Sequence, residues 1–163
     1  MPVIEATRTE CLVNTYKEGL FSAIAHDLIL RVERFKIEVG QDHSIKARFD
    51  AGSLVVISPE TLSANDKRSI KLSLEQDVLD VARYPEIIFV SSSVVPDGAG
   101  FQVKGRLTLC GSERAIEFEI RDENGKKSAE ILLHQPDFGI RPFSAMLGTL
   151  KIKPDVKIHI SVW

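Results

Sequence analysis

The residues of this sequence that could carry out chemistry are its histidines, serines and cysteines. His26 is followed by Asp27 within the mostly apolar stretch EGLFSAIAHDLILRV, residues 18–32. Adjacent side chains of a β-strand point to opposite faces, so on a strand Asp27 could not orient His26 as the carboxylate of a catalytic triad does. Ser22 and Ser144 are candidate nucleophiles, but neither lies in a Gly-x-Ser-x-Gly turn. These spacings do not favour a hydrolase.

The spacing of the metal-ligating residue types does not favour a metal site either. Histidines occupy positions 26, 43, 134 and 159, without an H-x-H or H-x-x-x-H pair. Cys11 and Cys110 are far apart and form no C-x-x-C motif, which predicts reduced thiols rather than a disulfide or a zinc site. We therefore expect no metal and no cofactor.

Charge and hydropathy limit the classes of partner. The chain has 21 Lys and Arg residues against 23 Asp and Glu residues, and neither sign forms a long run, so nucleic acid is not an expected partner. Near the start, Glu5, Arg8 and Glu10 stand where a secretion signal would have its apolar core, which predicts a cytoplasmic protein. We also expect no integral membrane segment, because no apolar run approaches roughly 18 residues.

Alternation of apolar and polar residues, which is typical of β-strands, dominates the second half of the chain. Alternating runs cover residues 101–109, 116–121, 128–135 and 150–160. The turns CGS and RDENGKK between them predict hairpins, and Pro154 marks a bulge or an edge in the last run. This half should therefore form a meander of antiparallel strands.

The first half alternates less regularly. The apolar phase of residues 28–32 shifts by one residue before residues 35–39, which predicts one long strand with a bulge or a sharp bend. Further strands are expected at 44–57, with Gly52 marking another bulge, and at 86–95.

One segment, residues 65–83, has a helical period instead. Its apolar stripe consists of Ile70, Leu74, Val78 and Ala82. Ser63 or Asn65 can cap the start, and Pro85 requires the helix to end by the preceding residue. Alternation over residues 70–74 leaves a short strand open as the alternative.

Together these elements predict an all-β fold: an antiparallel, eight-stranded barrel with one short helix near residues 65–83, in a single domain over residues 1–163. A barrel of eight strands has an interior just wide enough for side chains or for one small ligand. A sandwich of two sheets is the alternative.

Three stretches occur in a characteristic order: VLDVARYPEIIF (78–89), GRLTLCG (105–111) and DFGIRPFSAMLGTLKIKPDVKIHISV (137–162). In this order they resemble the YceI-like family of polyisoprenoid-binding proteins. The matching residues are Tyr84, Pro85, Phe89, Gly105, Leu107, Thr108, Gly111, Asp137, Phe138, Gly139 and Ile140. FDAGSLVV (49–56) resembles a further strand of the family, and His26 falls near the family's N-terminal histidine.

The resemblance implies a lipocalin-like barrel that binds an isoprenoid or a fatty-acid-like chain in its lumen, without catalysis. Two other functions stay open: a small hydrolase or isomerase acting on such a ligand, and a filled barrel that serves as a protein-interaction module. A monomer and a homodimer both stay open.

The expected ligand-binding residues are apolar, with a few polar candidates for a head group. The apolar set, which taken singly is also ordinary core, is Leu30, Val32, Phe49, Phe89, Phe101, Val103, Leu107, Phe118, Ile131 and Ile158. Of the polar candidates, Arg141 could pair with an anionic group such as a phosphate, and Ser144 and His26 could donate hydrogen bonds. The alternatives are a solvated Arg141 and a purely structural His26.

Overall fold

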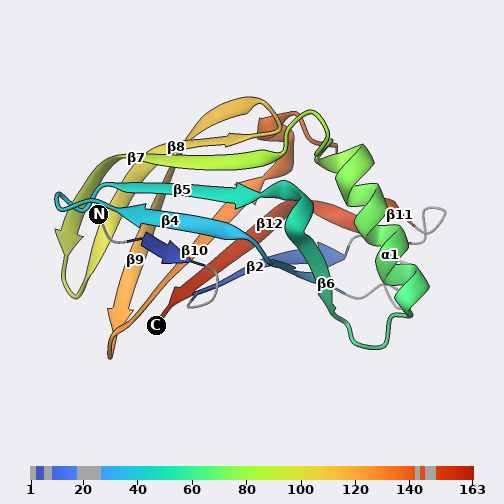
Figure 1. The fold of residues 1–163 in the computed structure, drawn as a ribbon, viewed down its shortest axis with the longest axis horizontal. Helices are drawn as coiled ribbons and strands as arrows, with labels where there is room; N and C mark the ends of the chain where they lie inside the picture. Colours follow the sequence, from blue (N-terminus) through green and yellow to red (C-terminus); the bar gives the residue numbers. More distant parts are fainter. Residues whose placement is uncertain (1–2, 6–8, 18–26, 142–143, 146–149) are drawn as a thin grey trace.

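The computed structural model describes residues 3–5, 9–17, 27–141, 144–145 and 150–163. Their strands form one antiparallel sheet that curls into a half-barrel, with a helix at one end (Figure 1). The strand order is β1-β4-β5-β7-β8-β9-β10-β12-β2-β3-β6, and β11 pairs with β12 outside this path. The all-β, antiparallel fold with one short helix predicted from the sequence is confirmed.

The elements have the following bounds. The strands are β1 (Val3–Glu5), β2 (Thr9–Lys17), β3 (Ile29–Val32), β4 (Phe35–Val39), β5 (Ile45–Asp50), β6 (Leu54–Ser58), β7 (Glu86–Asp97), β8 (Gly100–Leu109), β9 (Ser112–Glu123), β10 (Lys126–His134), β11 (Ser144–Ala145) and β12 (Leu150–Val162). The helices are α1 (Ala64–Ser73), its π-helical continuation (Leu74–Val78) and two 3-10 helices (Ala51–Ser53 and Gln135–Phe138).

The expected count of eight strands is corrected by the structure. The described residues form a 12-stranded sheet, in which β1 has three residues and β11 has two. Without these two short strands, ten remain (12 − 2). The difference has two physical causes: β2 was not among the expected strands, and bends divide each of two expected strands into a pair, β3 with β4 and β5 with β6.

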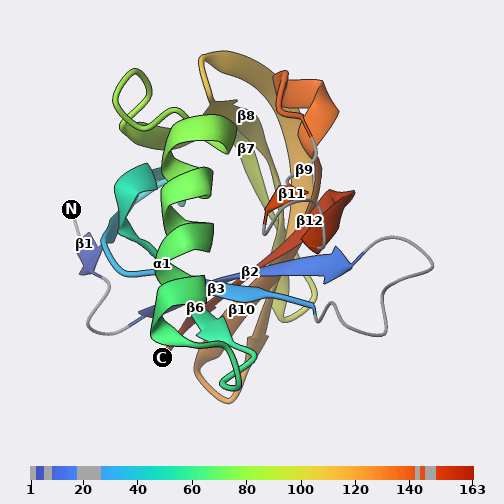
Figure 2. The same ribbon diagram turned by 90° about the vertical axis from the view of Figure 1, so that its right-hand side faces the viewer.

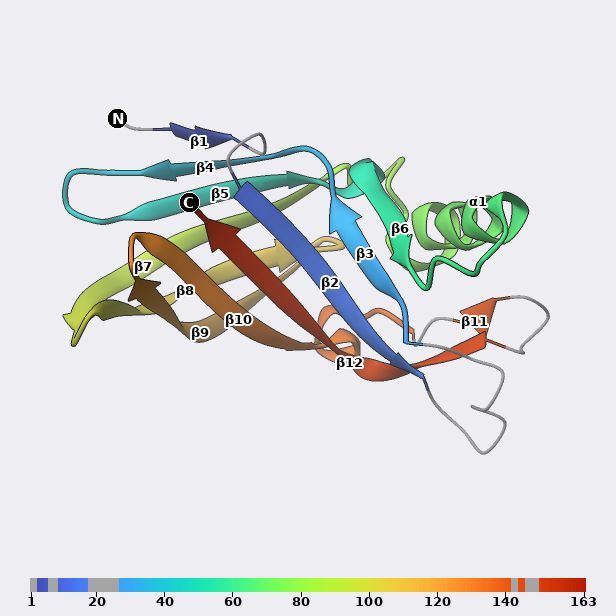
Figure 3. The same ribbon diagram turned by 90° about the horizontal axis from the view of Figure 1, so that it is seen from below.

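These bends produce one bent hairpin that joins the two ends of the curled sheet. β3 pairs with β2 and β6, whereas β4, which follows after only two residues, pairs with β5. β5 in turn pairs with β7. The hairpin therefore links β2 to β7 around the curl (Figure 3). This confirms the bend predicted from the phase shift between residues 32 and 35.

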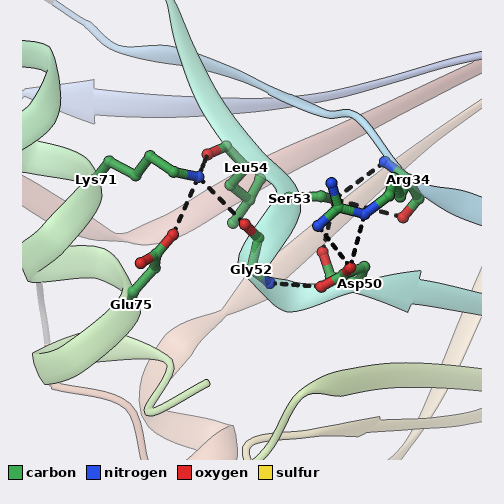
Figure 4. Close-up of polar contacts among 7 residues, drawn as sticks. All are labelled: Arg34, Asp50, Gly52, Ser53, Leu54, Lys71 and Glu75. Carbon is green, nitrogen blue, oxygen red and sulfur yellow. Dashed lines mark hydrogen bonds and ion pairs between the residues drawn. The ribbon is translucent and has the colours of Figure 1, made fainter. Parts of the chain in front are cut away.

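Polar contacts hold the corner of the bent hairpin (Figure 4). Arg34 Nε donates to Asp50 Oδ2 over 2.9 Å, and Asp50 Oδ1 accepts from the Gly52 amide, also over 2.9 Å. Ser53 Oγ donates to the Asp50 carbonyl at 2.7 Å and accepts from the Arg34 amide at 3.0 Å. Because backbone groups left unpaired by a bend must find other partners, these side chains replace the missing ladder bonds.

Helix α1 lies across one end of the half-barrel (Figure 2). Ser63 caps it, since its Oγ accepts from the Asp66 amide at 3.0 Å, and Ile70 is fully buried. Lys71 Nζ donates to the carbonyls of Gly52 and Leu54 over 3.2 and 2.6 Å. The helix is thereby attached to the corner of the hairpin (Figure 4).

The helical segment ends earlier than residue 83, which corrects the predicted boundary. The π-helical turn closes with the Leu79 amide donating to the Leu74 carbonyl at 2.8 Å, and the chain then reverses at Asp80, whose φ is 47°. A left-handed residue cannot continue a right-handed helix. Ala82, expected on the apolar stripe, is therefore exposed.

The remaining turns follow their sequence signatures. Cys110-Gly111 joins β8 to β9 with φ of 51° and 76°, and Asn124-Gly125 joins β9 to β10 with φ of 53° and 82°. Two positive values in succession define the type I′ hairpin turn. The register of β12 shifts between Ile152 and Val156, which confirms the bulge expected at Pro154. The described helices are too short or too polar to span a membrane.

Candidate functional site

The curled sheet encloses a cavity of about 260 Å³. Its surface is almost entirely hydrocarbon and comes from both halves of the chain. The inward-facing residues of β9, Ile116, Phe118 and Ile120, alternate with charged residues that face outward, as the pleat requires. The cavity is therefore a product of strand alternation and curvature.

The lining of the cavity is more buried at one end than at the other. Near α1 its lining residues Leu54, Leu79, Leu109 and Leu133 are buried. Towards the tips of the β4–β5 and β9–β10 hairpins the lining becomes half-buried. We call the region near α1 the deep end and the region near the hairpin tips the mouth.

Seven of the ten expected apolar residues line this cavity. They are Val32, Phe49, Phe89, Leu107, Phe118, Ile131 and Ile158. Leu30 and Val103, with exposed fractions of 2% and 0%, belong to the surrounding core, and Phe101 packs beside the His43 ring with centroids 5.1 Å apart. The alternation of apolar and polar residues alone therefore did not distinguish residues of the cavity wall from residues of the surrounding core.

Of the three polar candidates, Arg141 is the one whose side chain the structure describes. Arg141 is exposed and is not part of the cavity lining. Ser144 is in β11, and its backbone pairs with that of Lys151 in β12. His26 lies outside the described residues.

Several lining residues were not among the expected ones. They include Cys11 and Val13 of β2, Ile37 and Val39 of β4, Ile45 and Ala47 of β5, and Lys127 of β10. The lining positions in β4 and β5 follow the alternation of apolar and polar residues in those strands, so the sequence pattern could have predicted them. The phase of β10 could also have been followed back from Ile131 to Lys127. β2 offered only two apolar residues in phase, and its place in the wall depends on pairing with distant β12.

Aromatic rings form part of the cavity wall. The rings of Phe89 and Phe118 lie 5.4 Å apart at an angle of 56°, and those of Phe35 and Phe49 stack at 5.5 Å. Tilted and offset pairs at these separations are favourable beyond the area they bury. They give the apolar wall a defined shape.

The cavity contains a thiol that is unreactive at neutral pH. Burial raises the pKa of Cys11 to about 12. Burial also raises the pKa of Cys110 to about 11, with a smaller contribution from the negative charge of Asp80. Because the thiolate is the nucleophile, Cys11 acts here as a small apolar side chain.

The described residues offer little other chemistry at the cavity. Asp50 at the deep end is already paired with Arg34 and with the Gly52 amide. Among the residues that the structure describes, no three His, Cys, Asp or Glu side chains gather into a metal-binding group. What the arrangement can do is remove an aliphatic chain from water.

Comparison with known proteins places the fold. A family model described as the YceI-like domain matches residues 18–163. Three solved structures are similar over most of the chain. BcnA of Burkholderia cenocepacia has a TM-score of 0.67 at 14% identity, with 98% of each chain covered. A polyisoprenoid-binding domain from Saccharophagus degradans has a TM-score of 0.65 at 11% identity, covering 98% of this chain and 94% of that one.

The third is a YceI protein of Campylobacter jejuni, with a TM-score of 0.59 at 12% identity, covering 82% of this chain and 81% of that one. At these identities the likeness shows a shared fold. No curated protein matches the chain.

Proposed function

This chain belongs to the YceI-like family, and we propose that its cavity binds an isoprenoid or another long aliphatic chain without catalysing a reaction on it. The observation that carries the proposal is the 260 Å³ cavity with its hydrocarbon surface. Apolar pockets of this kind bind ligands by burying their apolar surface. The similar fold of a polyisoprenoid-binding domain adds support at the level of the family.

The size of the cavity suits a chain of moderate length. Each methylene group buried in the cavity contributes about 0.8 kcal/mol. About nine of them would contribute about 7 kcal/mol, the scale of a micromolar complex before association costs are subtracted. A longer ligand would leave its remainder at the mouth.

A binding role without catalysis is supported by the chemistry of the wall. The thiol that lines the cavity, Cys11, has a pKa of about 12 and is protonated at neutral pH. The acid of the deep end, Asp50, is occupied by Arg34. Neither group is activated as a nucleophile or as a general acid or base towards a ligand.

The test is direct detection of a ligand, with a variant that fills the cavity. Native mass spectrometry after gentle purification, followed by organic extraction, identifies bound lipid, and titration of delipidated protein with an isoprenoid quinone and a fatty acid gives affinities. Ala129→Phe places a ring on the inward face of β10, where Ala129 lies between Ile120 and Ile160. We expect it to weaken binding at least tenfold.

Ala115→Phe is the matched control, because Ala115 is exposed on the outer face of β9. It should bind like the unaltered protein. Delipidated protein that takes up neither probe would reject the proposal, and turnover of a bound lipid would reject its non-catalytic part.

A further inference from the structure

A cation, Lys127, is among the described residues that line the hydrocarbon cavity. Lys127 is in the same phase of β10 as Ala129, Ile131 and Leu133, and all four line the cavity. Among the described lining residues Lys127 is the only Lys, Arg or His. A lysine in this position places its methylenes against the apolar wall and its ammonium group in water.

Lys127 lies at the mouth. Its side chain is 53% exposed, whereas the β10 residue at the deep end, Leu133, is buried. Its strand neighbour is Val162 of β12, which also lines the cavity and is half-buried. An aliphatic chain that fills the cavity would therefore present its head group beside the Lys127 ammonium.

The ammonium is only weakly engaged by the protein itself. Its partner is Asp122 of β9, with 3.9 Å between Nζ and Oδ2, and the Asp122 side chain is 32% exposed. An ion pair this long and this accessible to water contributes little. Asp50, the acid in the lining, is held by Arg34 over 2.8 Å. Of the described lining residues, Lys127 is the one that offers a cation to a ligand.

We propose that the mouth binds an anionic head group, a carboxylate or a phosphate, on an amphiphile whose tail fills the cavity, with Lys127 as the counter-ion. This inference rests on the proposed function, and it adds the charge of the ligand's head group and the end of the cavity at which that head group lies. A charge-assisted hydrogen bond from the ammonium favours the anion over a neutral head group. Asp122 opposes it, since its carboxylate lies on the same inward phase of β9 and competes for Lys127.

The experiment compares decanoate and decyl phosphate with the neutral decanol, by calorimetric titration of delipidated protein at pH 8 and low salt. Lys127→Met keeps the aliphatic side chain and removes the charge, and we expect it to weaken binding of both anions about five- to tenfold. Binding of decanol should change less than twofold. Asp122→Asn should tighten binding of the anions, because it removes the competing carboxylate.

Lys126→Met is the control with the same change of net charge. Lys126 is the preceding residue, on the outer phase, and its ammonium lies 5.0 Å from the centre of the Trp163 ring. This variant should bind both anions as the unaltered protein does. If only one anion responds to Lys127→Met, the head group is of that kind.

The outcomes separate this inference from the proposed function. If decanol and the anions bind and Lys127→Met changes none of them, the counter-ion is rejected and the apolar cavity stands. If Lys126→Met weakens binding of the anions as much as Lys127→Met does, the net charge of the protein explains the effect and the inference is again rejected. If none of the three probes binds, both proposals fail.

Discussion

The ring of Phe89 lies over the backbone of Gly105. A Cβ atom added to Gly105 would be 2.5 Å from Phe89 Cζ and 2.5 Å from the carbonyl oxygen of Val90. Real side chains do not approach so closely. The absence of a side chain at Gly105 therefore lets Phe89 of β7 reach the Phe118 ring of β9 across the strand between them.

We expect Gly105→Ala to destabilise the protein. The backbone of β7 and β8 must separate or the Phe89 ring must move, and overpacking of this kind costs about 1 to 3 kcal/mol. Urea unfolding followed by tryptophan fluorescence or circular dichroism gives the free energy of unfolding. Gly52→Ala is the control, since its nearest contact would be an ordinary 3.4 Å to the Asp50 side chain. Equal stability of the two variants would contradict this account.

The stability of the protein should fall at alkaline pH because of Cys11. Its pKa is raised from 9.0 to about 12 in the folded protein. The folded state therefore keeps the proton longer than the unfolded state, so the stabilisation is complete below pH 9 and is lost as the pH rises towards 12. A pKa difference of three between the folded and unfolded states corresponds to at most about 4 kcal/mol in the free energy of unfolding.

The measurement compares unfolding free energies of the unaltered protein and Cys11→Ala from pH 8 to pH 11. The variant has a lower starting stability, because a buried side chain is truncated, but a shallower decline. Parallel curves would show that Cys11 does not carry the effect. Cys110 is present in both proteins, so its own raised pKa contributes equally to both stability curves.

Removal of the Lys71 charge should detach α1 from the corner of the bent hairpin. Lys71→Met loses the hydrogen bonds to the Gly52 and Leu54 carbonyls and the 3.0 Å ion pair with Glu75. Because the Lys71 side chain is partly exposed, water compensates for part of the lost interactions. We therefore expect the free energy of unfolding to fall by about 1 to 2 kcal/mol, as measured by thermal or urea unfolding. In Lys67→Met the change should be within about 0.5 kcal/mol, since the contact described for Lys67 is that of its backbone amide.

Local patterns predicted much of this fold because the physics behind them is local. Alternation located β8, β9 and β10, the phase shift located the bend before Phe35, and Ser63 marked the start of α1. The strand β2 and the early end of the helix at Val78 were not predicted. The former depends on pairing with β12, and the latter on an aspartate in a left-handed conformation.

The cavity was predictable only in part. Phase assigned Phe49 and Phe118 to the inward face, and both line the cavity. Val103 and Leu30 share that property in sequence and are instead buried in the core. Which inward residues meet the empty space depends on the curvature of the sheet, and curvature arises from bends and from contacts between distant strands.

The pairing of β2 with β12 also governs the order in which the molecule can be assembled. Cys11 stands opposite Ile160, so strands from the two extremes of the sequence are hydrogen-bonded neighbours. Loop closure over such a separation carries a large entropic cost and slows folding. Until β12 arrives, β2 and β10 present unpaired backbone edges, and during that interval the nascent chain is open to aggregation.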